Sequence, residues 1–452
     1  MPDTPSDDTV PDPMSLANAR TEWLAAAALP TPDPQLPEWF RELQTRSWRD
    51  LVTLPDPKRT DENWRFATLK LSRMDALEPA VAPAESQIAE VLERSEFTPH
   101  AAARFVFLNG RPVLTDPGEL TGRAGVICLP LREAILTQGE LVRAHFMREG
   151  APLGGAKFAA LHGAADLDGI FLHVAEGTKV EGAVEIYHWA TGENTAVFPH
   201  TLIVAEDQAD IRVIEYFCSL NPHDATVAVA LTDLAAERGG QIEYTALQNW
   251  NGHSRHVQIN ATRVGRDAKA RGCFVNLGSR WTRTESLSRM TGTGADSRML
   301  SVNLATGEQE FDQRTLQSHE AERTTSDLLY KNALYDKSRT IFSGLIRVDK
   351  GAHFTDAFQT CRNLLGSDEA EANSMPGLEI NADEVKCSHG STSGQISDDE
   401  IFYLRARGIP ASDARKMITL GFLNQVIDHI EAEEVRDHVH RLVEEKFLNV
   451  VE

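Results

Sequence analysis

A thiol and an imidazole lie two residues apart in the stretch VKCSHGSTSG, which covers residues 385–394. If this stretch is extended, Cys387 and His389 share one face, with β-carbons about 7 Å apart, because a strand rises roughly 3.3 Å per residue. Metal bonds of about 2.3 Å to sulfur and 2.1 Å to nitrogen let one iron or zinc ion contact both side chains. Two ligands do not complete a tetrahedral site, so further ligands must come from elsewhere in this chain or from another chain. A nucleophile with its base is a weaker interpretation, because this spacing is a poor way to bring the two side chains within hydrogen-bond distance.

Ordinary structural roles are the alternative for the same residues. Free cysteine is among the most buried residue types, and a histidine at a strand end is often simply hydrogen-bonded. Cys361 is the nearest second thiol, and a fold that stacks its strands could bring it alongside Cys387. The remaining cysteines (Cys128, Cys218 and Cys273) are irregularly spaced, so neither a disulfide framework nor a CxxC zinc site is predicted.

The elements around this pair divide the chain into three parts. Residues 1–100 are predicted to be a helical region, with residues 1–13 disordered. Residues 101–392 contain short runs with an apolar residue at every second position, such as 184–188, 257–261 and 378–382, which is typical of strands with one buried face. The fold class is therefore mainly β, and a closed barrel, two stacked sheets and a solenoid all remain open.

Residues 393–452 are predicted to form a helical domain. Ser397 begins a capping-box pattern that ends at Glu400, and the helix it opens should stop at Gly408. Ser412 or Asp413 can cap a second helix. The Gly- and Ser-rich residues 390–394 are expected to make the turn between the β region and the first of these helices.

The charge and the motifs exclude several function classes. Lys and Arg number 45 against 67 Asp and Glu, and the net charge of −22 disfavours nucleic acid and anionic lipid as partners. No GxxxxGK[ST] motif occurs, so we expect this chain to bind no nucleotide itself. No apolar run approaches the roughly 20 residues that cross a bilayer, and the first residues lack the basic region of a secretory signal, so a cytoplasmic location is predicted.

Two joined motifs carry a resemblance to a known family. Residues 378–390 read LEINADEVKCSHG and residues 401–410 read IFYLRARGIP. Together they resemble the SufB/SufD family, the scaffold subunits of an iron-sulfur cluster assembly machinery. Residues 62–66 (ENWRF) and 344–348 (GLIRV) are similar to further family segments. The Cys-Ser-His-Gly element at 387–390 resembles the SufD branch, whereas SufB members tend to carry Glu-His-Glu there.

The resemblance implies a right-handed parallel β-helix flanked by helical terminal regions. It also implies a non-catalytic scaffold subunit that pairs with a SufB-like paralogue, docks a SufC-like ABC ATPase through its C-terminal helices, and forms a homodimer in isolation. A transient iron-sulfur cluster is expected at the subunit interface, with His389 as the first candidate ligand and Cys387 and Cys361 as further candidates. The expected docking or packing surface is apolar and consists of Ile401, Phe402, Leu404, Met417, Ile418 and Phe422.

Two alternatives stand beside this hypothesis. Cys361 falls near the position where SufB members carry a candidate cluster cysteine, so a SufB-like subunit that holds the cluster through Cys361 is the first. The second is a stand-alone β-solenoid enzyme acting on a polysaccharide, with acidic side chains as acid and base. The acidic residues form no repeating ladder along the sequence, which disfavours the enzyme.

Overall fold

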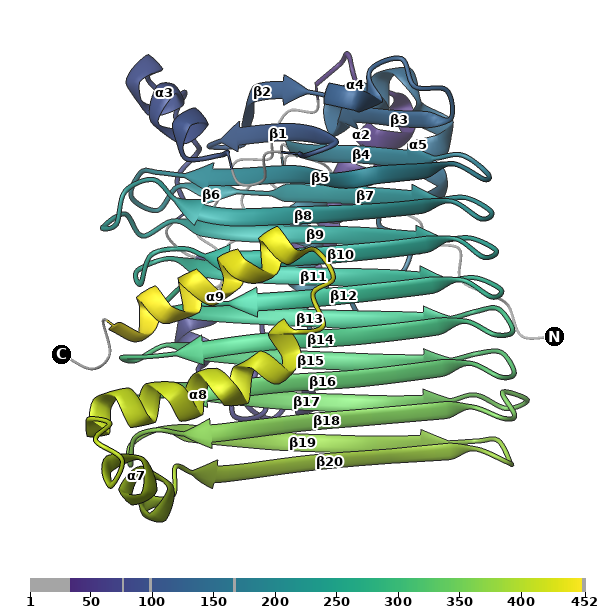
Figure 1. Cartoon of the computed structure of the whole chain (residues 1–452). Helices are drawn as coiled ribbons and strands as arrows, with labels where there is room; N and C mark the ends of the chain where they lie inside the picture. The colour runs from purple at the N-terminus through teal and green to yellow at the C-terminus, as the bar shows by residue number, and fades with distance from the viewer. Residues whose placement is uncertain (1–32, 75–76, 97–99, 166–167, 449–452) are drawn as a thin grey trace.

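The computed structural model describes residues 33–74, 77–96, 100–165 and 168–448, and residues 1–13, predicted to be disordered, lie outside these ranges. Strands make up 43% and helices 24% of the structure, and the strands wind into a β-solenoid of about eight turns (Figure 1). The prediction of a mainly β protein, with a solenoid core and helices at both ends, is confirmed. None of the described helices is long and apolar enough to cross a bilayer.

Two sheets face each other across the core. The front sheet contains, in spatial order, β2 (Arg111–Asp116), β1 (Ala103–Leu108), β5 (Lys179–Ala190), β8 (Asp210–Ser219), β10 (Gln241–Asn249), β12 (Lys269–Asn276), β14 (Asp296–Ala305), β16 (Thr325–Leu334), β18 (Asp356–Leu365) and β20 (Lys386–Gln395). The rear sheet contains β19 (Glu371–Ile380), β17 (Arg339–Val348), β15 (Glu310–His319), β13 (Trp281–Met290), β11 (Arg255–Val264), β9 (Val227–Ala236), β7 (Pro199–Ala205), β4 (Asp168–Val174) and β3 (Val126–Pro130), and β6 (Ala196–Val197) pairs with β9.

From β7 onward, successive strands alternate between the sheets, so one coil of the solenoid is two strands long. Each strand pairs in parallel with the strand one coil away, as in the aligned series Lys269, Asp296, Thr325, Asp356 and Lys386. Neighbouring members of this series are 27 to 31 residues apart. The coils therefore have nearly constant geometry without a constant sequence length.

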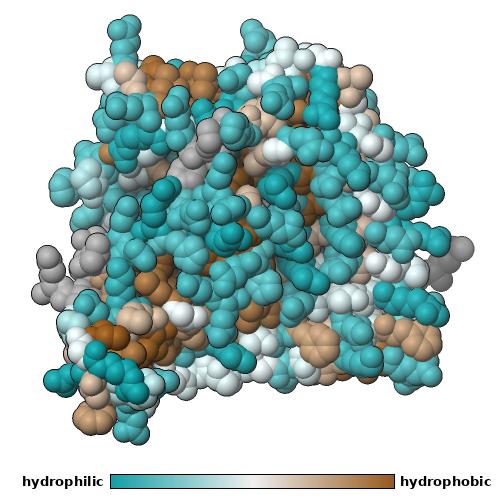
Figure 2. Space-filling view, in the orientation of Figure 1, coloured by the Kyte–Doolittle hydropathy of each residue, from teal (hydrophilic) through white to brown (hydrophobic). Residues whose placement is uncertain are grey.

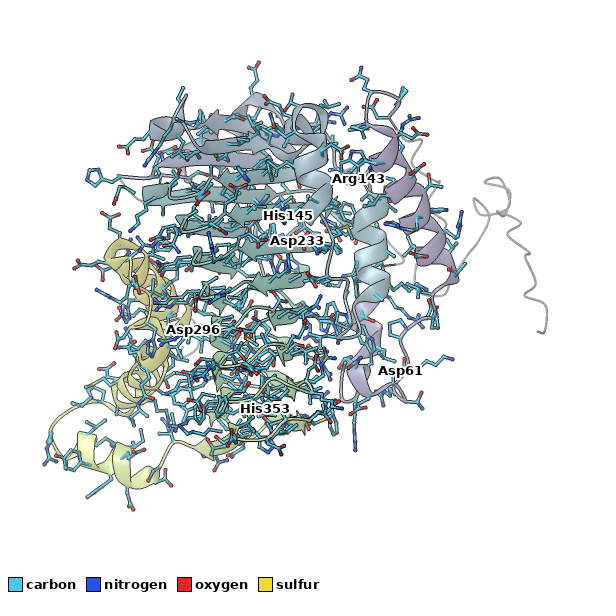
Figure 3. The ribbon with its side chains drawn as sticks, turned by 90° about the vertical axis from the view of Figure 1, so that its right-hand side faces the viewer. Asp61, Arg143, His145, Asp233, Asp296 and His353 are labelled. Carbon is cyan, nitrogen blue, oxygen red and sulfur yellow. The ribbon has the colours of Figure 1, made fainter. Side chains whose placement is uncertain are left out.

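Helices cover the outer faces of both sheets, as the edge-on view in Figure 3 shows. The helices before and within the solenoid are α2 (Glu38–Thr53), η1 (Glu62–Trp64), η2 (Leu69–Ser72), α3 (Glu85–Glu93), η3 (Gly118–Leu120), α4 (Leu131–Thr137), α5 (Gly139–His145) and α6 (Ala156–Ala164), and those after it are α7 (Asp398–Arg405), α8 (Ala411–Ile427) and α9 (Glu433–Leu448). Helices α4, α5 and α6 contact the rear sheet, and α8 contacts β14 and β16 of the front sheet.

Burial follows this covering. Every residue of β9 is buried, because one face meets the core and the other lies under α6. In β18, by contrast, buried residues alternate with exposed or half-buried ones. The alternation identifies the inner face of β18, since nothing comparable covers its outer face.

Four local predictions need correction. Residues 390–394 lie within β20 rather than in a turn, because pairing with β18 fixes them as strand, and this β region continues to Gln395. Three short helices, α4 to α6, interrupt the region predicted to be entirely β. Helix α8 begins at Ala411 with Pro410 as its N-cap, two residues before the predicted start. Ser397 does cap α7, accepting a hydrogen bond from the Asp399 N–H, and Gly408 beyond that helix has a positive φ of 85°.

The two ends of the solenoid differ. At the upper end in Figure 1, each sheet finishes with a strand that pairs antiparallel to its neighbour, β2 with β1 and β3 with β4. At the lower end the last strands, β19 and β20, are parallel to the rest of their sheets and have no further strand beside them in the described part of the chain. One edge of each sheet is therefore unpaired at this open end.

Candidate functional site at the open end of the solenoid

The Cys387–His389 pair lies on β20, the last strand of the front sheet. In the register with β18, Cys387 is opposite Ala357, and His389 is opposite Gln359. Ala357 and Gln359 are buried and point into the solenoid, so Cys387 and His389 also belong to the inner face of their strand. His389 is nevertheless exposed, because no further coil covers this face at the open end.

The backbone of β20 also offers free hydrogen-bonding groups. The Lys386 N–H donates to the Thr355 carbonyl at 2.8 Å, on the β18 side. In a parallel ladder, alternate residues direct their backbone groups to opposite sides of the strand. The N–H and C=O groups of Cys387, His389 and Ser391 therefore point away from β18, towards the free edge. An added strand could pair with them.

The third candidate, Cys361, lies one strand further in. It is opposite Ser391 in the register, which is four residues along β20 from Cys387. That offset corresponds to about 13 Å along the strand, far more than the roughly 4 Å between two ligand atoms of one metal ion. Cys361 and Cys387 therefore lie on neighbouring strands, but they are too far apart to bind one metal ion together. Across the described ranges, no three His, Cys, Asp or Glu side chains are grouped so that they could hold a metal ion.

The surroundings of the two thiols make them poor ligands in this conformation. Cys361 has no exposed surface, packs with Tyr330 and Phe342, and has Sγ 3.6 Å from Asn332 Nδ2 and 3.8 Å from Asn363 Oδ1. Burial raises the pKa of its thiol to about 12, so the thiolate that binds metal is scarce at neutral pH. Cys387 is half-buried against an apolar cluster, and burial raises its pKa as well.

One residue beside His389 was not anticipated. Gln359 is buried, its Nε2 donates to the Gly344 carbonyl at 3.3 Å, and its Oε1 accepts no hydrogen bond within the described chain. The register places it opposite His389. Its position two residues before Cys361, on the same face of a strand, was the only signal in the sequence that could have suggested it.

Exposed apolar side chains gather near the same end. Phe354, Phe358 and Ile380 are each more than 40% exposed, and they lie on β18 or β19 or just before them. Large apolar side chains exposed together at an unpaired sheet edge indicate a protein interface.

The predicted apolar surface on the C-terminal helices is divided by the fold. Helix α8 buries Ala414, Thr419, Leu423, Val426 and Ile427 against the solenoid and its neighbours. Of the six predicted residues, Ile401 is buried, and Leu404, Ile418 and Phe422 are half-buried. Phe402 and Met417 remain 71% and 52% exposed, together with Tyr403. Figure 2 shows hydrophobic surface over α7 and the adjoining part of α8.

Lysines attach these helices firmly to the solenoid. Lys331 on β16 donates to the Phe422 carbonyl at 2.8 Å, and its ammonium lies 4.2 Å from the Phe422 ring centroid. Lys446 on α9 donates to Gln309 Oε1 at 2.7 Å and also contacts the carbonyls of Leu277 and Leu304. Helices α8 and α9 are therefore fixed relative to the coils that lead to the open end.

Comparisons with known proteins agree with this architecture. Residues 188–422 match the family described as "SUF system FeS cluster assembly, SufBD core domain". The iron-sulfur cluster assembly protein SufD of Escherichia coli is 30% identical over 85% of this chain and 87% of its own length. SufD of Bacillus subtilis is 26% identical over 91% of this chain and 95% of its own length, and SufB of the same organism is 25% identical over 66% and 64%. The chain belongs to the SufB/SufD family, on its SufD branch.

Proposed function

We propose that this chain is a SufD-like, non-catalytic scaffold subunit in the assembly of iron-sulfur clusters in the cytoplasm. It pairs through its open end with a SufB-like subunit and docks a SufC-like ABC ATPase on its C-terminal helices. The observation that carries the proposal is the unpaired edge at β19 and β20, with His389 exposed beside it.

The cluster is cargo in this proposal, held transiently at the subunit interface. His389 supplies one ligand, and the partner subunit supplies the others, since the described residues of this chain form no complete ligand set. Cys387 is a secondary candidate. ATP is bound by the ATPase partner, because this chain has no phosphate-binding GxxxxGK[ST] motif.

A strand-edge variant tests the pairing. Ser391→Pro removes an N–H that faces the free edge while leaving the hydrogen bonds to β18 in place. We expect this variant to lose association with a co-expressed SufB-like subunit, and homodimerisation in its absence, as measured by size-exclusion chromatography with light scattering. Ser391→Ala, which keeps the N–H, is the matched control and should associate normally. Equal association of both variants, with unchanged circular dichroism, would contradict pairing through this edge.

A second experiment separates His389 from Cys361 as the cluster ligand. His389→Ala should lower the yield of cluster on the anaerobically purified complex severalfold without reducing complex assembly. Cys361→Ser should have little effect on the yield, because the Cys361 thiol is buried and protonated. Iron and sulfide content and the visible absorption spectrum measure the yield. The opposite order of effects would support the SufB-like alternative.

A further inference from the structure

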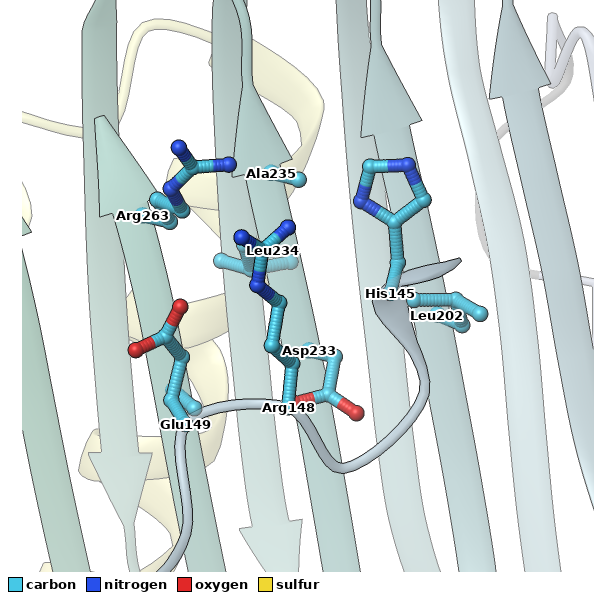
Figure 4. A pocket seen from close by; sticks show the side chains of 9 residues that line it. His145, Arg148, Glu149, Leu202, Asp233, Leu234, Ala235 and Arg263 are labelled. Atoms are coloured by element: carbon cyan, nitrogen blue, oxygen red, sulfur yellow. The ribbon is translucent and has the colours of Figure 1, made fainter. Parts of the chain in front are cut away.

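A second site lies far along the solenoid from the open end, on the outer face of the rear sheet. The loop that follows α5 crosses strands β7, β9 and β11 and leaves a pocket beneath it (Figure 4). His145 lines it from the end of α5, Arg148 lines it from the loop, and Leu202, Asp233 and Arg263 line it from the strands. The pocket has a volume of about 240 Å³ counting its mouth, and the enclosed part has room for about one water-sized group.

The loop above this pocket is fixed at three points, on either side of Arg148. The Phe146 ring stacks on His200, with centroids 4.2 Å apart and planes at 15°. The Met147 N–H donates to Asp233 Oδ2 at 2.7 Å, and the Glu149 carboxylate pairs with Arg289. Arg148, between these anchors, is therefore held across the strands rather than on a free loop.

Two arginines line the pocket, in a chain whose net charge is −22. Figure 4 shows the Arg148 and Arg263 side chains side by side, with His145 on the other flank. Arg148 forms no ion pair or hydrogen bond with any residue that the structure describes, and Arg263 has only Glu237, at 3.6 Å.

The acids near the pocket leave Arg148 as the arginine of its wall without a carboxylate partner in the part of the chain that the structure describes. Glu237 pairs with Arg263, Glu149 shares Arg289 with Glu320, and burial raises the pKa of Asp233 to about 7. Burial lowers the pKa of His145; Glu237 opposes this shift, and the two arginines add to it. Arg148, which has no carboxylate partner among the described residues, and Arg263, whose partner Glu237 lies 3.6 Å away, can both donate charge-assisted hydrogen bonds to an anion.

We propose that this pocket binds a small oxyanion of the phosphate type, which the neighbouring Arg148 and Arg263 hold together. One oxygen enters the enclosed part, and the others face the guanidinium groups at the mouth. The proposal concerns a ligand site separate from the open end and does not depend on the scaffold role.

The test uses inorganic phosphate and the full chain. Phosphate, sulfate, acetate and chloride are compared at constant ionic strength by isothermal titration calorimetry and by thermal unfolding. We expect phosphate or sulfate to bind and to raise the unfolding temperature more than chloride or acetate does. Arg148→Gln should weaken this binding at least about tenfold, the loss expected for a charge-assisted contact. Arg143→Gln removes the same charge from an exposed position on α5 and should bind phosphate normally.

Three results would overturn the proposal. These are no oxyanion effect beyond that of chloride, equal binding by wild type and Arg148→Gln, and equal loss in Arg148→Gln and Arg143→Gln. Acetate binding as strong as phosphate binding would contradict the phosphate-type assignment. Arg263→Gln gives a second variant, in which the loss should match that of Arg148→Gln.

Discussion

A chain of three buried side chains fixes the position of one proton. His162 Nδ1 lies 2.8 Å from the Val229 carbonyl, which only accepts, so this nitrogen carries hydrogen and His162 Nε2 must accept from His200 Nδ1 at 3.0 Å. His200 Nε2 then presents a lone pair 3.4 Å from Asp233 Oδ2. Burial lowers the pKa of both histidines to about 3 and raises that of Asp233 to about 7, so the proton belongs on Asp233.

This assignment makes stability depend on pH in a defined direction. The folded state binds the Asp233 proton more tightly than the unfolded state, so Asp233 lowers stability as the pH rises from about 4 to about 7. In Asp233→Asn this loss, roughly 2–4 kcal/mol, should be absent, because the amide does not titrate in this pH range. Urea unfolding at pH 5 and pH 8 measures it. Glu119→Gln, an exposed acid changed in the same way, is the control and should keep the wild-type dependence of stability on pH. If Asp233→Asn also keeps that dependence, the assignment of the proton to Asp233 is wrong.

At the scale of the element, residues 62–66 (ENWRF) lie over the rear sheet, and we call this segment the strap. Trp64 is buried, and the Arg283 guanidinium lies 3.8 Å from its ring centroid. Arg283 also donates to the Asn63 carbonyl at 3.1 Å and to Asp312 Oδ2 at 2.5 Å, while Arg314 donates to Asp312 Oδ1 at 2.6 Å. One buried aspartate therefore joins two arginines under the strap.

Removing that aspartate should be far more costly than removing a surface one. Asp312→Asn leaves two guanidinium groups buried with insufficient counter-charge, and we expect a loss of about 3–5 kcal/mol in the free energy of unfolding. Asp296→Asn is the same substitution in a partly exposed pair 3.9 Å from Arg298, and it should cost less than about 1 kcal/mol. Chemical unfolding of the two variants side by side makes the comparison. Similar losses would show that the buried pairs do not hold the strap.

At the scale of the whole molecule, the two exposed apolar regions lie on different elements. One is at the open end, and the other consists of Phe402, Tyr403 and Met417 on α7 and α8. The proposed function assigns the SufB-like subunit to the first region and the SufC-like ATPase to the second. Since α8 is attached to β16 through Lys331, a partner on the helices is mechanically connected to the coils near the edge.

The helix surface can be tested separately from the edge. The double variant Phe402→Asp and Met417→Asp should weaken binding of a SufC-like ATPase at least about tenfold, because it places charges in a desolvated contact. Pairing with the SufB-like subunit should persist. Val81→Asp, which alters a residue that is 72% exposed elsewhere, should bind both partners normally. A pull-down with each purified partner measures both affinities, and undiminished ATPase binding by the double variant would exclude this surface.

The sequence predicted the strands and the two ends of α7 well, because period-two burial, Ser397 and Gly408 act locally, but it misplaced the cap of α8. It failed where long-range pairing overrides local preference, as at residues 390–394, whose glycines and serines are strand only because β18 holds them. The register of Cys361 against Ser391 depends on coil lengths that vary between 27 and 31 residues, so no spacing rule could supply it. His389 was predicted from its motif, and that role stays a prediction, whereas Gln359 opposite it could be found only from the fold.

The two ends of the solenoid differ, and pairing through β19 and β20 would use only the open end. Where β19 and β20 of one chain meet those of another, both free edges are consumed, and the opposite ends finish in short strands, β2 and β3, that pair antiparallel to their neighbours. Assembly by this route is therefore self-terminating at two solenoids and cannot continue into a filament. Adding or deleting a whole coil would change the length of the solenoid. It would not change the number of chains that can pair through β19 and β20.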